Sequence, residues 1–124
     1  MNIIFTKDAP APIGPYSQAI LTNGTLYCSG QIAINPETGE FIGGDIAKQT
    51  KTVCDNITAL LNAVGLDFSH VVKTTCFLTA MQDFSDFNNI YEQYFISKPA
   101  RSCVAVKELP KNALVEIEIV AVKN

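Results

Sequence analysis

The chain has 124 residues, of which 48% are hydrophobic and 17% are charged, and its net charge is −3 at pH 7. This composition is typical of a globular protein with a sizeable core, and it excludes a disordered chain. With 9 Lys and Arg against 12 Asp and Glu, no basic stripe of the kind that binds nucleic acid is evident. We therefore expect a single domain over residues 1–124.

Membrane and secretion signals are also missing from the sequence. No apolar run approaches the roughly 20 residues that a membrane-spanning helix needs, and the N-terminal segment "MNIIFTKDAPAP" does not have the pattern of a signal peptide. The four cysteines are far apart and form no Cys-x-x-Cys pair: Cys28, Cys54, Cys76 and Cys103. Such cysteines are most simply reduced and buried, and a cytoplasmic location is expected.

The first third of the chain predicts strands and turns. A short strand is expected over Asn2–Phe5. The two apolar segments on either side of Asn23-Gly24 predict a β-hairpin, because Asn-Gly favours the positive backbone angles of a two-residue turn. The segment "NPETGE" (35–40) has the residues of a turn.

Two amphipathic helices follow. The first is expected from Asp45 to Gly65, with Asp45 capping its free N–H groups and Gly65 providing a left-handed stop. Its apolar residues recur at intervals of three and four: Ile46, Val53, Ile57, Leu60, Leu61 and Val64. The second is expected to be capped by Asp83 and to end before Pro99. Its buried stripe would be Phe84, Phe87, Tyr91 and Phe95.

Three further strands are expected over residues 71–80, 102–106 and 114–122. The resulting order, β-β-β-α-β-α-β-β, predicts a two-layer α+β domain with a mixed β-sheet and two helices on one face. Along the last strand, Val115, Ile117, Ile119 and Ala121 would lie under the helices. The opposite face carries Glu116, Glu118, Val120 and Val122. Because this second face is half apolar, a symmetric oligomer is expected to cover it.

Metal-dependent and nucleophilic chemistry find little support in the sequence. The single histidine, His70, argues against a histidine-rich metal site, and scattered cysteines argue against a zinc cluster. A nucleophilic pair of Cys103 and His70 is conceivable, because thiol and imidazole are the required groups. The simpler interpretation is that His70 is a surface residue entering a strand and Cys103 a small strand residue.

Three features point to a small-molecule site. Arg101 stands before an apolar strand, and its planar guanidinium binds carboxylates through paired hydrogen bonds, although a salt bridge to an acid of a neighbouring chain is an alternative. Glu116 and Glu118 share one face, where burial and mutual repulsion would raise the pKa of at least one of the two carboxyls into a range useful for proton transfer. The alternative is that one of them pairs with Lys73 or Arg101 and the other is solvated. Asn88 is a polar residue on the second helix's apolar stripe, where it could instead bind backbone.

Several motifs together resemble one known family. They are "IGPYSQA" (13–19), "SGQI" (29–32), "NPETGE" (35–40), "VVKTT" (71–75), "PARSCV" (99–104) and "EIE" (116–118). The chain resembles the Rid family nearly end to end, and within it the RidA branch of reactive intermediate imine/enamine deaminases. "IGPYSQ" and "PARSCV" at this separation are specific, whereas "NPETG" or "EIE" alone would be weak.

The resemblance implies a chorismate-mutase-like fold and a homotrimer with active sites in the clefts between subunits. It implies hydrolysis of 2-imino acids, formed by dehydratases from serine and threonine, to 2-oxo acids and ammonia without metal or organic cofactor. It assigns Arg101 to the substrate carboxylate and Glu116 to the water. Tyr16, Ser29, Gly30 and Asn88 would line the same pocket, together with the backbone of Cys103. The segment "YFISKPARSC" looks shorter than in many relatives, which would shorten a loop at the rim.

Two other functions are consistent with the same residues. The chain could bind 2-oxo acids in this cleft without catalysis, although a carboxylate receptor gains little from a nearby glutamate. It could also be an interaction protein, since chaperone-like and translation-inhibiting roles have been proposed in this family. This interaction role ranks last because the sequence lacks the basic patch that RNA contact would favour.

Overall fold

The computed structural model describes residues 1–123. Within them lie six strands, two α-helices and three 3₁₀ turns, the turns being at Phe68–His70, Met81–Asp83 and Pro110–Asn112. The order is β1 (Asn2–Ile4), β2 (Ala19–Thr22), β3 (Thr25–Gln31), α1 (Ile46–Asn62), β4 (Val71–Leu78), α2 (Phe84–Tyr94), β5 (Ala100–Ala105) and β6 (Val115–Val122). This is the order that the sequence predicts.

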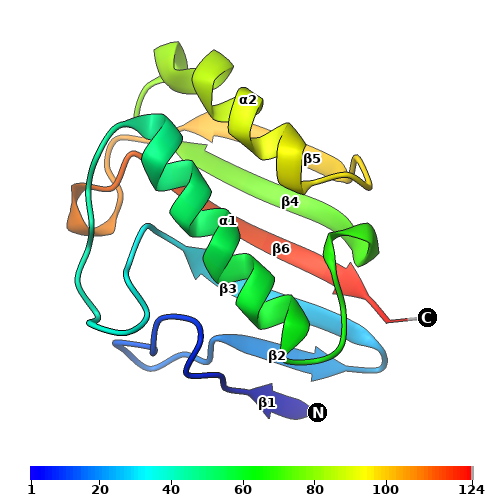
Figure 1. The fold of residues 1–124 in the computed structure, drawn as a ribbon. Coiled ribbons are helices and arrows are strands. Elements are labelled where there is room, and N and C mark those ends of the chain that lie inside the picture. The colour runs from blue at the N-terminus through cyan, green and yellow to red at the C-terminus, as the bar shows by residue number, and fades with distance from the viewer. Residues whose placement is uncertain (124) are drawn as a thin grey trace.

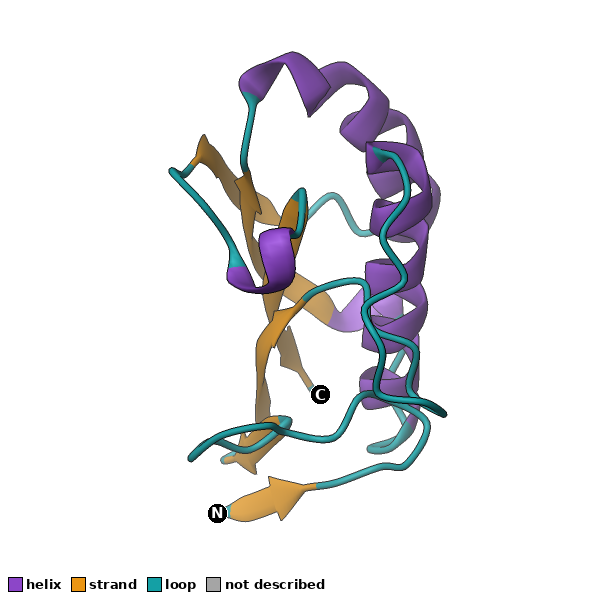
Figure 2. Ribbon diagram, turned by 90° about the vertical axis from the view of Figure 1, so that its left-hand side faces the viewer, coloured by secondary structure: helices purple, strands orange, loops and turns teal. Residues whose placement is uncertain are grey.

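All six strands form one sheet in the order β1-β2-β3-β6-β4-β5. The last strand, β6, is therefore inserted antiparallel between β3 and β4, while β4 and β5 are parallel. Both α-helices lie on the same face of this sheet, and within residues 1–123 no α-helix covers the other face (Figures 1 and 2). The predicted α+β architecture with a mixed sheet is confirmed.

The core lies between the helices and the sheet. The four alternate residues of β6 predicted to face the helices are almost fully buried: Val115, Ile117, Ile119 and Ala121. From the helix side they meet apolar side chains that repeat at helical spacing, including Val53, Ile57 and Phe87. Alternation along the strand thus places the intervening residues, Glu116 among them, on the open face.

The predicted turns and caps are mostly confirmed, with one correction. Asn23 and Gly24 have φ angles of 50° and 77°, as the β2–β3 hairpin turn requires. Asp45 Oδ1 accepts a hydrogen bond from the Lys48 backbone N–H at 2.9 Å. The prediction that Asp83 caps α2 is wrong. Its φ and ψ of −84° and −4° are helical, because a 3₁₀ turn runs directly into α2, and its side chain makes no capping bond.

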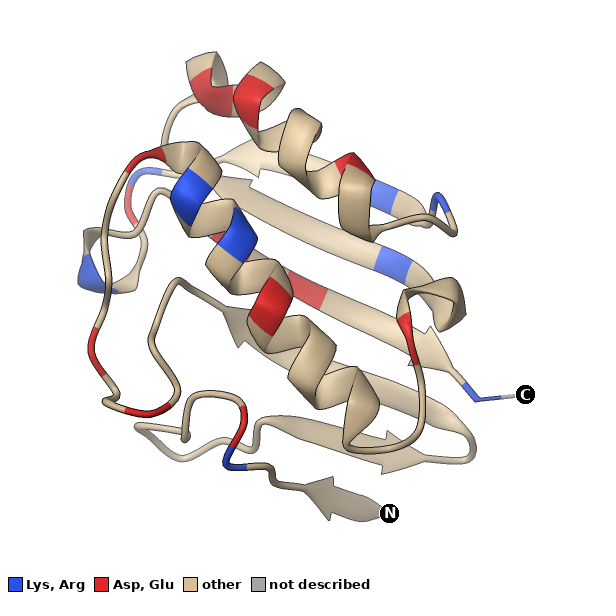
Figure 3. Cartoon of the chain, in the orientation of Figure 1, with Lys and Arg blue, Asp and Glu red and all other residues tan. Residues whose placement is uncertain are grey.

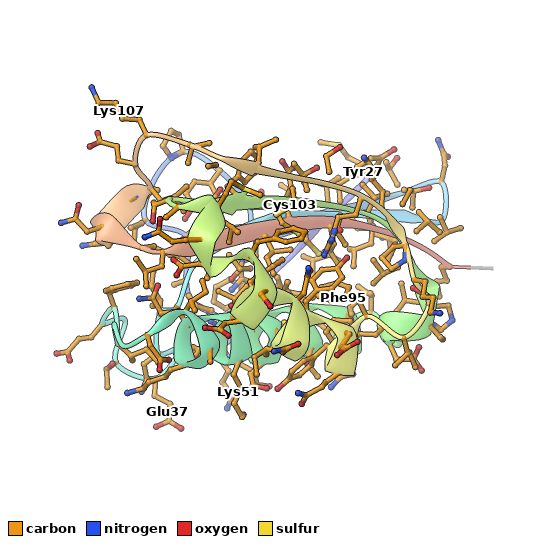
Figure 4. All side chains as sticks on the ribbon, turned by 90° about the horizontal axis from the view of Figure 1, so that it is seen from above. Tyr27, Glu37, Lys51, Phe95, Cys103 and Lys107 are labelled. Carbon is orange, nitrogen blue, oxygen red and sulfur yellow. The ribbon has the colours of Figure 1, made fainter. Side chains whose placement is uncertain are left out.

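The face of the sheet away from the helices is partly apolar. Tyr27 and Val104 are about half exposed there, and Figure 4 shows Tyr27 on the opposite side of the sheet from Phe95, which packs under α2. Such a surface favours a partner that covers it. No helix within residues 1–123 has the length and apolar character needed to cross a membrane.

Candidate functional site

Arg101 lies on β5, the edge strand, with its side chain under α2. Its Cα partner on β4 is Thr74, which is buried on the helix side. Directly opposed residues of neighbouring strands point to the same face, so Arg101 also projects toward the helices. There its Nη1 donates a hydrogen bond to Asn88 Oδ1 at 2.7 Å. The structure therefore brings together two residues that the family resemblance assigns to one pocket.

Among the residues that the structure describes, no carboxylate neutralises Arg101. Within residues 1–123 the ion pairs join Lys51 to Asp55 and His70 to Asp67, so Arg101 has no acidic partner there. With one hydrogen bond in use, the guanidinium keeps N–H donors for an anion. It faces a cleft of about 520 Å³ whose walls include Asn88, Tyr91 and Pro99. An uncompensated arginine in a cleft suits a carboxylate ligand.

Glu116 lies on β6, half-buried on the open face of the sheet. Burial raises the pKa of its carboxyl above the ordinary value of 4.5, and the neighbouring Glu118 raises that pKa further. The carboxylate lies over Gly30 of β3, in space that a side chain at that position would occupy. A carboxyl group with a raised pKa at the edge of a cleft is suited to accept and return a proton.

The cleft beside Glu116 has a volume of about 400 Å³. Its lining includes three more of the residues assigned from the sequence, Tyr16, Ser29 and Gly30, together with the apolar side chains of Ile13 and Pro110. Ser29 Oγ donates to the Ser17 carbonyl at 2.6 Å, so this hydroxyl holds the N-terminal loop against β3. Tyr16 is 49% exposed, and its hydroxyl accepts a bond from the Ile13 N–H at 3.4 Å.

The loop that forms one wall of this cleft is held by Gln18, which sequence reasoning missed. Gln18 is 2% exposed. Its Oε1 accepts from the Thr6 N–H at 2.7 Å, and its Nε2 donates to carbonyls of Thr6, Ala9 and Pro10. The sequence carries one signal, an amide side chain at the start of an apolar strand, but the identity of its hydrogen-bond partners depends on the path of the N-terminal loop.

Arg101 and Glu116 lie on opposite faces of the sheet. Arg101 shares its register position with Thr74, on the helix face. Glu116 pairs with Phe77, and Phe77 pairs with Val104, both on the open face. One copy of the chain therefore carries two half-sites, one with Arg101 and Asn88 and the other with Glu116, Gly30, Ser29 and Tyr16. It does not bring them together.

Cys103 lies near the first half-site but lacks the features of a nucleophile. It is the Cα partner of Cys76 and points to the helix side. Burial raises the pKa of its thiol, while Arg101 acts in the opposite direction. His70 is bound to Asp67 in a capping box just before β4, whereas Cys76 lies toward the other end of that strand. The conceivable Cys103–His70 pair is therefore not formed.

Known proteins similar to this chain share both its sequence and its fold. A sequence model of the family described as "Endoribonuclease L-PSP" matches residues 6–123. A RutC family protein of Pyrococcus horikoshii is 51% identical, covering 99% of this chain and 98% of its own length. The 2-iminobutanoate/2-iminopropanoate deaminase of Bos taurus is 48% identical, covering 99% of this chain and 90% of its own. The crystal structure of a Rid family protein of unknown function from Yersinia pestis has a TM-score of 0.94 and 53% identity, with 98% of both chains covered.

Proposed function

Because the chain belongs to the Rid family, we propose that it hydrolyses reactive 2-imino and enamine acids to 2-oxo acids and ammonia. The observation that carries the proposal is the pair of half-sites. One offers a guanidinium that has no acidic partner in the described part of the chain, and the other a glutamate whose pKa is raised. These are the two groups that the reaction needs, and relatives at this level of identity are named for it.

The chemistry requires no strong nucleophile. A 2-imino acid protonated on nitrogen is already electrophilic at C2. A water oxygen adds to C2 while Glu116 takes a proton from that water, which gives a neutral carbinolamine. Glu116 then returns the proton to nitrogen, and the C–N bond breaks. Ammonia leaves as the Glu116 carboxylate accepts the hydroxyl proton and C=O forms, and this proton then passes to ammonia to give ammonium. The net reaction converts iminium and water into a 2-oxo acid and an ammonium ion.

Arg101 would hold the substrate carboxylate during these steps. A hydrogen bond to a charged group contributes about 1.5–3 kcal/mol, and fixing the carboxylate also fixes C2 relative to the water. Asn88 supports the guanidinium from one side. Tyr16, Ser29 and Gly30 form the wall beside Glu116.

The two half-sites would meet only between copies of the chain. Arg101 is at the edge strand of the sheet, and Glu116 is on the open face. A second copy that packs its β5 edge against this face would complete a site and cover the exposed Tyr27 and Val104. We propose a symmetric trimer as this assembly, with a sedimentation mass of three chains; a mass of one chain would contradict a shared site.

The experiment is to generate the imine in place with threonine dehydratase and follow the release of 2-oxobutanoate. Added wild-type protein should accelerate release, and Arg101→Ala should abolish the acceleration. The matched control is Lys107→Ala, which removes an exposed cation beyond the end of β5 (Figure 4). The proposal fails if wild type gives the same time course as no added protein.

Substitution of Glu116 distinguishes catalysis from simple binding of 2-oxo acids. Glu116→Gln should keep the binding of 2-oxobutanoate and lose turnover, because the amide can still occupy the site but cannot accept the water proton. Glu118→Gln, on the same strand and face, is the control. Binding by wild type without turnover would instead favour a non-catalytic receptor for 2-oxo acids.

A ribonuclease role, which the family description names, has less support in this chain. Its net charge is −3, and Figure 3 shows Lys and Arg residues dispersed over helix, strand and loop rather than gathered in one patch. Nucleic-acid affinity depends chiefly on clustered positive charge. We therefore favour the small-molecule reaction.

A further inference from the structure

Three residues of α2 surround the guanidinium of Arg101. Phe84, Asn88 and Tyr91 are spaced at i, i+4 and i+7, so they share one face of the helix. The Arg101 Cζ lies 4.8 Å from the centre of the Tyr91 ring and 5.4 Å from that of Phe84. Asn88 accepts one N–H of the same group. The cation is therefore held by two aromatic rings and a neutral amide.

Tyr91 is itself fixed at both ends. Its hydroxyl is 2.8 Å from Thr74 Oγ1, and Thr74 is fully buried on β4. Its ring stacks on Phe95 with centroids 4.1 Å apart and planes at 16°. Thr74 is also the Cα partner of Arg101. Thr74 therefore pairs with the backbone of Arg101 and also hydrogen-bonds to the hydroxyl of Tyr91, whose ring contacts the Arg101 side chain.

The neutrality of these contacts matters for binding an anion. An aspartate or glutamate in place of Asn88 would orient the guanidinium but cancel its charge. Aromatic faces attract the cation through the ring quadrupole and leave its positive charge and its N–H edge available. They also restrict a long side chain that would otherwise sample many rotamers, so less entropy is lost when a carboxylate binds.

We propose that Tyr91 is a positioning residue for carboxylate recognition: anchored by Thr74, its ring holds the Arg101 guanidinium in the orientation that binds the substrate carboxylate. This inference rests on the proposed function and deepens it. Tyr91 is assigned no contact with the reacting atoms. Replacing Tyr91 should therefore weaken substrate binding, and it should do so only when Arg101 is present.

The test measures the Kd of 2-oxobutanoate, with KM and kcat, for Tyr91→Leu, Tyr91→Phe and Thr74→Val. Loss of the ring in Tyr91→Leu should weaken binding about tenfold, within the range of a partly buried cation–π contact. Tyr91→Phe restores the ring and should recover most of the affinity, with about a threefold deficit for the lost hydroxyl bond. Thr74→Val should show the same deficit.

The control is Tyr94→Leu on the same helix, because the Tyr94 ring contacts Phe68 rather than Arg101. The Kd of this variant should equal that of wild type.

A double-mutant cycle distinguishes positioning from general support of the fold. In the Arg101→Ala background, Tyr91→Leu should cause no further loss of affinity. The inference is overturned if Tyr91→Leu weakens binding equally with and without Arg101, or if it lowers stability while Kd is unchanged. If Tyr91→Leu does not fold, unchanged affinity in both Tyr91→Phe and Thr74→Val overturns it. An Arg101→Ala protein with wild-type binding and turnover would instead overturn the proposed function itself.

Discussion

The carboxylate of Glu116 lies over Gly30, in the space that a side chain at position 30 would fill. A Cβ at Gly30 would come within 2.8 Å of Glu116 Cδ and 3.0 Å of its Cγ. The register between β3 and β6 shifts between Cys28 and Gln31, so Gly30 is in an irregular part of the ladder. The missing side chain, rather than an unusual φ angle, determines where the carboxylate lies.

Replacing Gly30 with alanine should therefore damage activity more than folding. The added methyl group would displace the end of a flexible side chain, which can move, so the free energy of unfolding should change by less than about 1 kcal/mol. Displacing the carboxylate by about 1 Å from its position should lower kcat about 100-fold. Steady-state kinetics and urea unfolding check the two parts. In a Glu116→Gln background, Gly30→Ala should lower the remaining activity little further. A large additional loss of activity would show that Gly30 acts on something other than Glu116.

The half-buried carboxyl of Glu116 should make the protein less stable as pH rises. Its folded-state pKa is above the ordinary value of 4.5, so between these two values the folded state binds more protons than the unfolded state, and stability falls with increasing pH. Glu116→Gln cannot ionise. It should have a higher Tm than wild type above this window, and the difference should shrink below pH 4.5.

Thermal unfolding from pH 4 to pH 8, read by circular dichroism, tests this difference. Glu118→Gln provides an internal control, because Glu118 is the smaller of the two causes that raise the pKa of Glu116. That variant should reduce the pH dependence without abolishing it. A Tm difference between Glu116→Gln and wild type that is constant across the whole range would contradict the raised pKa.

Gln18 should be the polar side chain on which the N-terminal loop depends most. Gln18→Leu has nearly the same volume but leaves the Thr6 N–H and the carbonyls of Thr6, Ala9 and Pro10 without their partner. Because unsatisfied buried groups cost about 1–3 kcal/mol each and some of these are only partly buried, we expect a loss of about 2–4 kcal/mol in unfolding free energy. Gln93→Leu is the matched control, since its single bond to Asn89 is solvent-exposed. Equal effects of the two substitutions would contradict the assignment.

The sequence predicts the elements well because their signals are local. The stripe of α1, the Asn23-Gly24 turn and the alternation along β6 each follow from backbone geometry over a few residues. Asp83 failed as a cap because the 3₁₀ turn before α2 changes its backbone angles, and this turn has no comparable signal. The aromatic contact of Arg101 with Tyr91 was missed for another reason. At helical spacing Tyr91 is indistinguishable from a core residue, and only the parallel pairing of β4 and β5 places the arginine against its ring.

Mixing two inactive variants tests whether the half-sites of different copies combine. Arg101→Ala retains Glu116, and Glu116→Gln retains Arg101. If each site takes its arginine from one chain and its glutamate from another, unfolding and reassembling the two variants in equal amounts restores some sites. About a quarter of the wild-type rate should return. Each site is then formed by two chains that associate at random, and it is active only when one chain supplies an intact Arg101 and the other an intact Glu116. Each variant reassembled alone should remain inactive. If Arg101 and Glu116 acted within a single chain, every chain in the mixture would carry one defect and no activity would return, which would refute the shared site.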